Sequence, residues 1–191
     1  GYDFIALSLN TPSHYTEQEI AMLKAALDKA VGRDPKKPVF VVTHYHAKDT
    51  VKDSDNEKQG GGLLRDLLNG YPQVVSVSGH THNPLQDPRS IWQGEFTAID
   101  TSTLCYGCIT VKPPAVNQIS CLIPYGHESV GCLFLEIYAD RLVFRRFSVR
   151  ARREIEPDSP WTVPWPHNPA SAPYSFAARR AAEKAPQFAS D

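Results

Sequence analysis

Apolar positions along the chain follow two different spacings, and together they predict a mixed α/β fold. Three short apolar runs, rich in β-branched residues, predict strands over Tyr2–Leu9, Lys36–Thr43 and Gln73–Ser78. The last two runs lack polar alternation, which is typical of strands buried on both faces of a parallel sheet. We therefore expect helices or another layer to cover both faces of that sheet.

The segment after the first predicted strand has the signals of an amphipathic helix. Thr16 and Glu19 have the spacing of a capping box, in which each side chain bonds the backbone of the other residue. The apolar stripe that follows repeats at intervals of three and four residues: Ile20, Leu23, Ala26, Leu27 and Ala30. Gly32 and Pro35 predict that the helix ends at about Val31.

Between the second and third predicted strands lie a loop and a short helix. Ala47–Gln59 is polar and charged, so we expect a solvated loop there. Gly60-Gly61-Gly62 then leads into a short helix over Leu63–Leu68, which Asn69-Gly70 ends.

After residue 82 the pattern changes from alternating strands and helices to short strands. Ser90–Gln93 and Phe96–Asp100 flank Gly94 and predict one hairpin. Ser129–Tyr138 and Arg141–Val149 predict a second, longer antiparallel pair.

The carboxyl-terminal part has a different composition from the rest. Prolines recur from Pro157 to Pro173, and Trp161 and Trp165 lie among them, so we expect an extended strap that the two tryptophans anchor to the core. Strong helix formers predict a short helix over Phe176–Lys184. We therefore divide the chain into a domain over residues 1–150 and a Pro/Trp-rich extension over residues 151–191.

Composition and charge narrow the classes of function. The 191 residues are 41% hydrophobic and 21% charged, which is ordinary for a globular domain with a core. The formal charge of −1 gives no basic footprint, so we expect no nucleic-acid partner and no anionic membrane surface as a partner. No apolar run approaches the about 20 residues that a membrane-spanning helix needs. Because the only methionine is Met22, we expect the chain to be a fragment of a longer protein.

The cysteines bear on zinc binding and on the cellular compartment. There are four of them: Cys105, Cys108, Cys121 and Cys132. A structural zinc ribbon normally has two C-x-x-C pairs and this chain has one, so we favour disulfides or buried thiols. The even number weakly favours an exported or periplasmic protein, and the compartment is otherwise open.

Histidines follow two of the predicted strands. His44 comes directly after Lys36–Thr43, and Gly79-His80-Thr81-His82 comes directly after Gln73–Ser78. Because the carboxyl ends of parallel strands meet at one edge of a sheet, we expect His44, His80 and His82 to gather there as metal ligands. Three nitrogen ligands without a carboxylate would make an incomplete site.

These motifs resemble a known family. The segments PVFVVTHYH and VVSVSGHTH resemble the carboxyl-terminal half of a calcineurin-like metallophosphoesterase, the fold that includes purple acid phosphatases. The resemblance runs over about Tyr2 to Val149, from the strand YDFIALSLN to the hairpin GCLFLEIYADRLVFRRFSV. It implies an α/β fold of the calcineurin-like type, a β-sandwich flanked by helices, of which this chain would form one half.

The resemblance also implies a function and its cofactors. Complete domains of the family hold two metal ions (Zn, Fe or Mn) and hydrolyse phosphate esters with a metal-bound hydroxide. Carried over by position, His44 and His80 resemble ligands of one ion and His82 a ligand of the other. The family's D-x-H, G-D and G-N-H motifs are absent from this sequence, so the resemblance implies a partial site, unidentified catalytic residues, and a missing amino-terminal half as partner.

Further residues near His44 are candidates for binding. Tyr45 and His46 are candidates for contact with the substrate phosphate or for a place behind the metal ligands. Asp49, Asp53 and Asp55 could supply the missing oxygens, although a charged loop is usually only solvated. Two alternative functions stay open at this point. One is a non-catalytic module that docks a partner chain, and the other is a mononuclear zinc protein that uses His44, His80 and His82.

Overall fold

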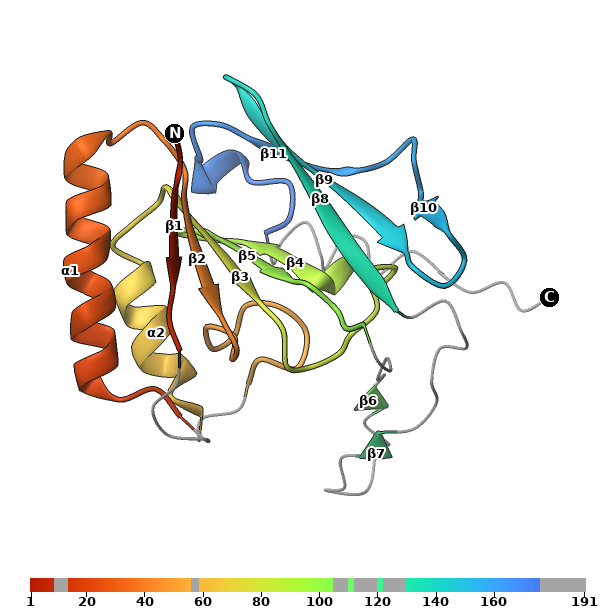
Figure 1. The fold of residues 1–191 in the computed structure, drawn as a ribbon, viewed down its shortest axis with the longest axis horizontal. Helices are drawn as coiled ribbons and strands as arrows, with labels where there is room; N and C mark the ends of the chain where they lie inside the picture. The colour runs from red at the N-terminus through yellow and green to blue at the C-terminus, as the bar shows by residue number, and fades with distance from the viewer. Residues whose placement is uncertain (9–13, 56–58, 105–109, 112–119, 122–129, 176–191) are drawn as a thin grey trace.

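The computed structural model describes residues 1–8, 14–55, 59–104, 110–111, 120–121 and 130–175, with backbone only at residues 110–111 and 120–121. The fold is mixed α/β (Figure 1). No described helix combines the length and apolar character that crossing a membrane requires. The predicted helix over Phe176–Lys184 and the side chains of Cys105, Cys108 and Cys121 lie outside the described residues. Cys132 is a half-buried free thiol.

A five-stranded sheet forms the centre of the molecule. Its order is β1-β2-β3-β5-β4, and all neighbours are parallel except β4, which is antiparallel to β5. The strands are β1 (Asp3–Ala6), β2 (Val39–Thr43), β3 (Val74–Ser78), β4 (Ile91–Gln93) and β5 (Thr97–Asp100). The register pairs Thr43 with Ser78 and Ser78 with Asp100, so three strands end at the same edge of the sheet.

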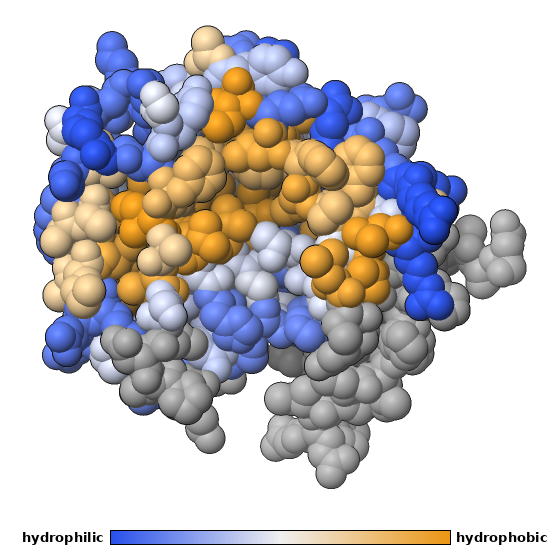
Figure 2. Space-filling view, viewed as in Figure 1, coloured by the Kyte–Doolittle hydropathy of each residue, from blue (hydrophilic) through white to orange (hydrophobic). Residues whose placement is uncertain are grey.

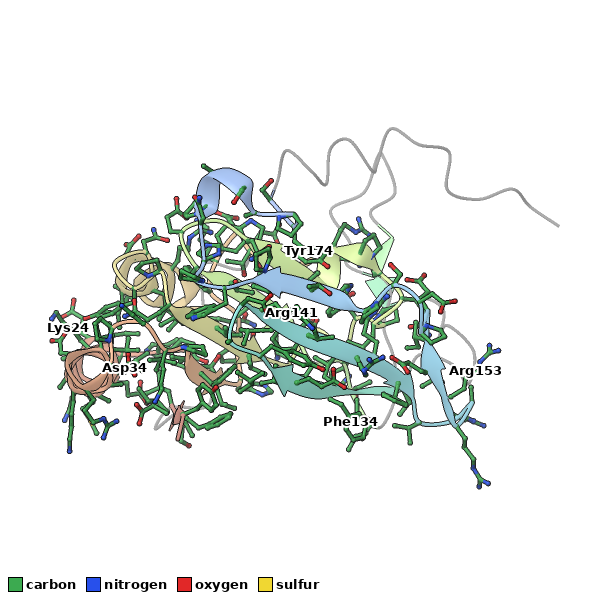
Figure 3. The ribbon with its side chains drawn as sticks, turned by 90° about the horizontal axis from the view of Figure 1, so that it is seen from above. Lys24, Asp34, Phe134, Arg141, Arg153 and Tyr174 are labelled. Atoms are coloured by element: carbon green, nitrogen blue, oxygen red, sulfur yellow. The ribbon has the colours of Figure 1, made fainter. Side chains whose placement is uncertain are left out.

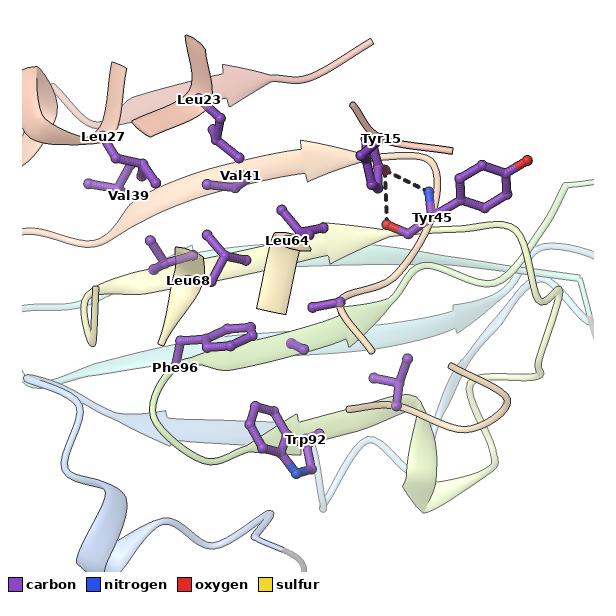
Figure 4. Packing of buried hydrophobic residues seen from close by; sticks show 14 of the residues in the cluster. Tyr15, Leu23, Leu27, Val39, Val41, Tyr45, Leu64, Leu68, Trp92 and Phe96 are labelled. Carbon is purple, nitrogen blue, oxygen red and sulfur yellow. Dashed lines mark hydrogen bonds between the residues drawn. The ribbon is translucent and has the colours of Figure 1, made fainter. Parts of the chain in front are cut away.

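Two helices cover one face of this sheet. The longer helix is α1 (Glu17–Arg33), and the shorter is α2 (Gly61–Leu68). The predicted capping box is confirmed, because the Thr16 hydroxyl accepts from the Glu19 backbone N–H and the Glu19 carboxylate accepts from the Thr16 backbone N–H. Figure 4 shows the core between the helices and the sheet, which includes Leu23, Leu27, Val39, Val41, Leu64, Leu68, Trp92 and Phe96.

A second, antiparallel sheet covers part of the opposite face. It consists of β8 (Gly131–Ile137), β9 (Arg141–Ser148), β10 (Arg153–Ile155) and β11 (Trp161–Pro164). Its apolar side forms a second core with the central sheet, to which Phe40, Ile99, Leu142, Phe144 and Val163 belong. Seen from above in Figure 3, Lys24 on α1 and Arg153 on β10 lie at opposite ends of the molecule. The remaining elements are short: β6 (Thr110–Val111) pairs with β7 (Ser120–Cys121), and two 3-10 turns cover Pro88–Ser90 and Pro169–Ser171.

The predicted strap is confirmed as an extended segment anchored by its tryptophans. Residues 161–164 form β11, which pairs with β9, and the Trp161 side chain is buried in the second core. Trp165 donates its indole N–H to the backbone oxygen of Lys36 at 2.8 Å. Strands β10 and β11 therefore belong to the same sheet as β8 and β9.

The loop after His44 differs from the prediction of a solvated segment. Half of the described residues of Ala47–Gln59 are buried: Ala47, Thr50, Val51, Lys52 and Ser54. Its polar groups find partners within the protein, because the Lys48 N–H donates to Gly61 O at 2.9 Å and the Lys52 N–H donates to Arg89 O at 3.0 Å. A polar segment can be buried where its hydrogen bonds are made internally, and that is why this loop packs inward.

Candidate functional site

The parallel strands bring two of the predicted histidines into contact. His44 follows β2 directly and His80 lies two residues beyond the end of β3, so both stand at the carboxyl edge of the central sheet. Their ring centroids are 5.0 Å apart, and His80 Nδ1 lies 3.2 Å from His44 Nε2. Both residues are exposed to solvent. The predicted pairing of these strand-end histidines is therefore present.

Other side chains surround the histidine pair. The Tyr45 ring meets the rings of His44 and His80 edge to face, at centroid distances of 4.8 and 4.5 Å. The Gln59 amide lies 2.7 Å from His80 Nε2. Partial burial lowers the pKa of His80, and the nearby His44 and His82 lower it further. His80 is thus biased toward the neutral form, which is the form that binds a metal ion.

Tyr15 holds the backbone of the segment that carries His44. The Tyr15 hydroxyl accepts from the Tyr45 N–H at 2.9 Å and donates to the Tyr45 carbonyl at 3.1 Å (Figure 4). Burial raises the pKa of Tyr15, so the phenol keeps its proton at neutral pH. These contacts join the segment before α1 to the loop that carries His44.

Two glycines let the α2 segment approach the same loop closely. Gly60 has a φ of +69°, and a Cβ on it would lie 2.7 Å from the backbone oxygen of Tyr15. A Cβ on Gly61 would lie 2.8 Å from the backbone oxygen of His46. Both positions therefore exclude a side chain, and they explain why the chain places glycines here.

His46 lies beneath the histidine pair, with 3% of its side chain exposed. Its Nδ1 bonds the Ser78 hydroxyl, and its Nε2 is 3.2 Å from the Thr81 hydroxyl and 3.7 Å from a carboxylate oxygen of Asp100. Burial lowers the pKa of His46 to about 3, and the neighbouring His80 and His44 add to this effect. Burial likewise raises the pKa of Asp100 to about 7. The imidazole is therefore neutral, and the two groups do not form an ion pair.

Tyr45 and His46, the two residues predicted to contact the substrate, lie in different places in the structure. Tyr45 is buried beside the histidine rings, and His46 is buried and lies 3.2 Å from the hydroxyl of Thr81, the residue between His80 and His82. Contact of either residue with a substrate stays a prediction.

The polar residues below the histidines were not predicted from the sequence. Asp100 is fully buried at the end of β5, and Thr81 donates its hydroxyl to it. Asn83, also fully buried, accepts from the Lys52 ammonium at 3.1 Å. One signal could have identified Asp100: it ends an apolar run, and its strand β5 is adjacent to β3, the strand that leads to His80.

The geometry of His44 and His80 suits two ligands of one ion. With metal–nitrogen bonds of about 2.0–2.1 Å, two ligands at a tetrahedral angle have nitrogens about 3.3 Å apart, and the separation here is 3.2 Å. Among the described residues, no group of three or more His, Cys, Asp or Glu side chains is arranged to hold a metal ion. His82, which is half-buried with a φ of 56°, is therefore not gathered with the pair into such a group.

The loop carboxylates Asp49, Asp53 and Asp55, which were candidates to replace the missing oxygens, form no metal-holding group with the histidines among the described residues. The Asp53 carboxylate accepts from the Lys52 ammonium at 2.8 Å.

Comparison with known proteins gives little beyond this geometry. No family model and no curated protein sequence matches the chain. One of the solved structures that resemble it is a dimetal phosphatase from Danio rerio, with a TM-score of 0.49 and 15% sequence identity over 79% of this chain. The chain spans 38% of the length of that phosphatase. A likeness at this level transfers neither a fold family nor a function.

Proposed function

We propose that this chain is the carboxyl-terminal half of a calcineurin-like metallophosphoesterase domain and contributes part of its dinuclear metal site. The observation that best supports this proposal is the pair His44 and His80, whose nitrogens lie 3.2 Å apart at the ends of adjacent parallel strands. In this proposal the pair binds one ion and His82 contributes to the other. Bound metal ions would lower the pKa of a water molecule and supply the nucleophile for hydrolysis of a phosphate ester.

The proposed roles of the residues around the histidine pair follow from their contacts. His44 and His80 offer imidazole nitrogens, and Tyr45 packs against both rings and limits their rotation. Tyr15 fixes the backbone at Tyr45 and so fixes the position of the adjacent residue, His44. The oxygen ligands that a two-metal site needs are absent from these motifs, so a second segment carrying the D-x-H, G-D and G-N-H motifs must supply them.

An apolar groove supports the proposal that this second segment is the amino-terminal half of the same domain. The groove, of about 430 Å³, lies between the central sheet and β8 and is lined by Phe4, Val42, Val77, Leu133 and Leu135, among others. Phe4 is 64% exposed and Val42 is 41% exposed. Figure 2 shows the apolar band that crosses this face of the molecule. Burying one such side chain contributes about 1.5–3 kcal/mol.

The strands that border the groove are both edge strands. In the described part of the molecule β1 pairs only with β2, and β8 pairs only with β9. Each therefore offers backbone donors and acceptors along one side, which an added strand would pair. We expect the outward amides of β1 and β8 to exchange hydrogen rapidly in this chain and to become protected when the amino-terminal half is present.

Zinc titration by calorimetry tests the metal site. We expect His44→Ala and His80→Ala each to weaken zinc binding by at least about tenfold, because each removes one of two ligands of the same ion. His14→Ala is the matched control, since His14 is an exposed histidine outside the pair. Equal zinc affinity in all four proteins would contradict the proposal.

The same groove also favours a second candidate, a non-catalytic module that docks a partner chain. This candidate predicts that His80→Ala leaves partner binding unchanged and that zinc has no effect on it. The metal-site proposal predicts that partner binding tightens with zinc, because both segments then share the ions.

A further inference from the structure

The loop that carries the histidine motif has an unusual backbone. His80 and His82 have φ values of 75° and 56°, in the left-handed region that residues with a side chain rarely adopt. Thr81 lies between them. Residues in this region persist where surrounding contacts hold them in place, so some part of the structure must hold this loop.

The contacts of Thr81 identify what holds it. The Thr81 hydroxyl donates to Asp100 Oδ2, and His46 Nε2 lies 3.2 Å from the same hydroxyl. The Thr81 backbone N–H donates to Gly79 O at 2.9 Å, which closes the turn. The Thr81 side chain, between the two histidines, is thus bonded to groups in the interior of the protein.

Asp100 is itself rigidly placed. It is fully buried at the end of β5, in register with Ser78 of β3. Its second oxygen, Oδ1, accepts from the Ser102 N–H at 2.8 Å. The next residue, Thr101, donates its N–H to Ser78 O at 2.8 Å, which locks the end of β5 against the strand that precedes the histidine motif.

We propose that Asp100 and Thr81 are positioning residues that hold the Gly79–His82 loop in its left-handed conformation and so keep His80 beside His44. The metal part of this inference rests on the proposed function, whereas the placement of His80 does not.

Isosteric substitution tests the contact. Thr81→Val removes the hydroxyl and keeps the shape, and Thr81→Ser keeps the hydroxyl and so should restore the contact. Thr97→Val is the matched control, because Thr97 is a fully buried threonine on β5 that accepts from Gln93 at 3.2 Å, away from the histidines. Asp100→Ala removes the other partner of the contact.

The first measurement is the ring resonances of His44 and His80 by NMR, assigned with single His→Gln variants. We expect Thr81→Val and Asp100→Ala to shift the His80 resonance and to remove its through-space contact with His44. Thr81→Ser and Thr97→Val should keep both. If Asp100→Ala does not fold, the comparison of Thr81→Val with Thr81→Ser decides. An unchanged His80 resonance and contact in Thr81→Val would overturn the proposal.

The second measurement is zinc affinity by calorimetry on the same proteins. Loss of a residue that orients a metal ligand typically lowers metal affinity by about 10- to 100-fold, and we expect this for Thr81→Val with recovery in Thr81→Ser. A Thr81→Val protein that binds zinc as the wild type does would overturn the positioning role. If the wild type binds no zinc, the proposed function fails, and the resonances alone then decide whether Thr81 and Asp100 position His80.

Discussion

Removing the Tyr15 hydroxyl tests how the site is supported. Tyr15→Phe keeps the buried ring and deletes two hydrogen bonds to the backbone of Tyr45. The Tyr45 carbonyl keeps a donor in the Thr43 hydroxyl at 2.9 Å, whereas the Tyr45 N–H loses the Tyr15 hydroxyl as its acceptor. An unpaired buried donor costs about 1–3 kcal/mol. The variant no longer buries a hydroxyl, which offsets part of this, so we expect a loss of about 1–2 kcal/mol in unfolding free energy.

Urea denaturation, followed by tryptophan fluorescence, measures this loss. Tyr2→Phe is the matched control, because Tyr2 is 43% exposed and its change should stay within about 0.5 kcal/mol. The m-value should be the same in all three proteins, since the surface exposed on unfolding does not change. A Tyr15→Phe protein as stable as Tyr2→Phe would refute the view that this hydroxyl supports the His44 loop.

Two further predictions concern packing and pH. Gly61→Ala should destabilise the protein by about 1–3 kcal/mol through overpacking, because its Cβ would lie 2.8 Å from His46 O. Gly62→Ala, whose added Cβ meets nothing within 4 Å, should be neutral or stabilising. Thermal denaturation compares the two variants, and a Gly61→Ala protein as stable as Gly62→Ala would contradict the prediction. The folded-state pKa of Asp100 is raised to about 7 by burial, above the unfolded value, so its stabilising contribution is complete below about pH 4 and is lost as the pH rises through 7. Wild type should therefore lose stability relative to Asp100→Asn between pH 4.5 and 7.5 in urea titrations, and a constant difference would show that Asp100 ionises normally.

Local signals predicted the elements of the fold well. The capping box at Thr16 and Glu19 needs only residues three apart, and α1 begins where it predicts. The apolar runs, which are rich in the β-branched residue valine, predicted β2 and β3. The parallel pairing of those strands then followed, and with it the meeting of His44 and His80.

The buried polar contacts near the histidines could not be predicted from the sequence, because they join residues far apart along the chain. The Thr81 to Asp100 bond joins residues 19 positions apart, and the Lys52 to Asn83 bond joins residues 31 apart. A charged loop around Lys52 has the composition of a solvated segment, and only the tertiary structure provides the partners that let it be buried. Similarly, the proline-rich composition of the strap does not specify that β11 pairs with β9.

X-ray absorption at the zinc K-edge tests the central claim most directly, because it counts the imidazole nitrogens around the bound ion. The claim is that His44 and His80 bind the same ion. The zinc-loaded chain should show imidazole nitrogens at about 2.0–2.1 Å, and the count should fall by one in His44→Ala and by one in His80→Ala. An imidazole count that neither substitution changes, or a shell made of oxygen alone, would contradict the account.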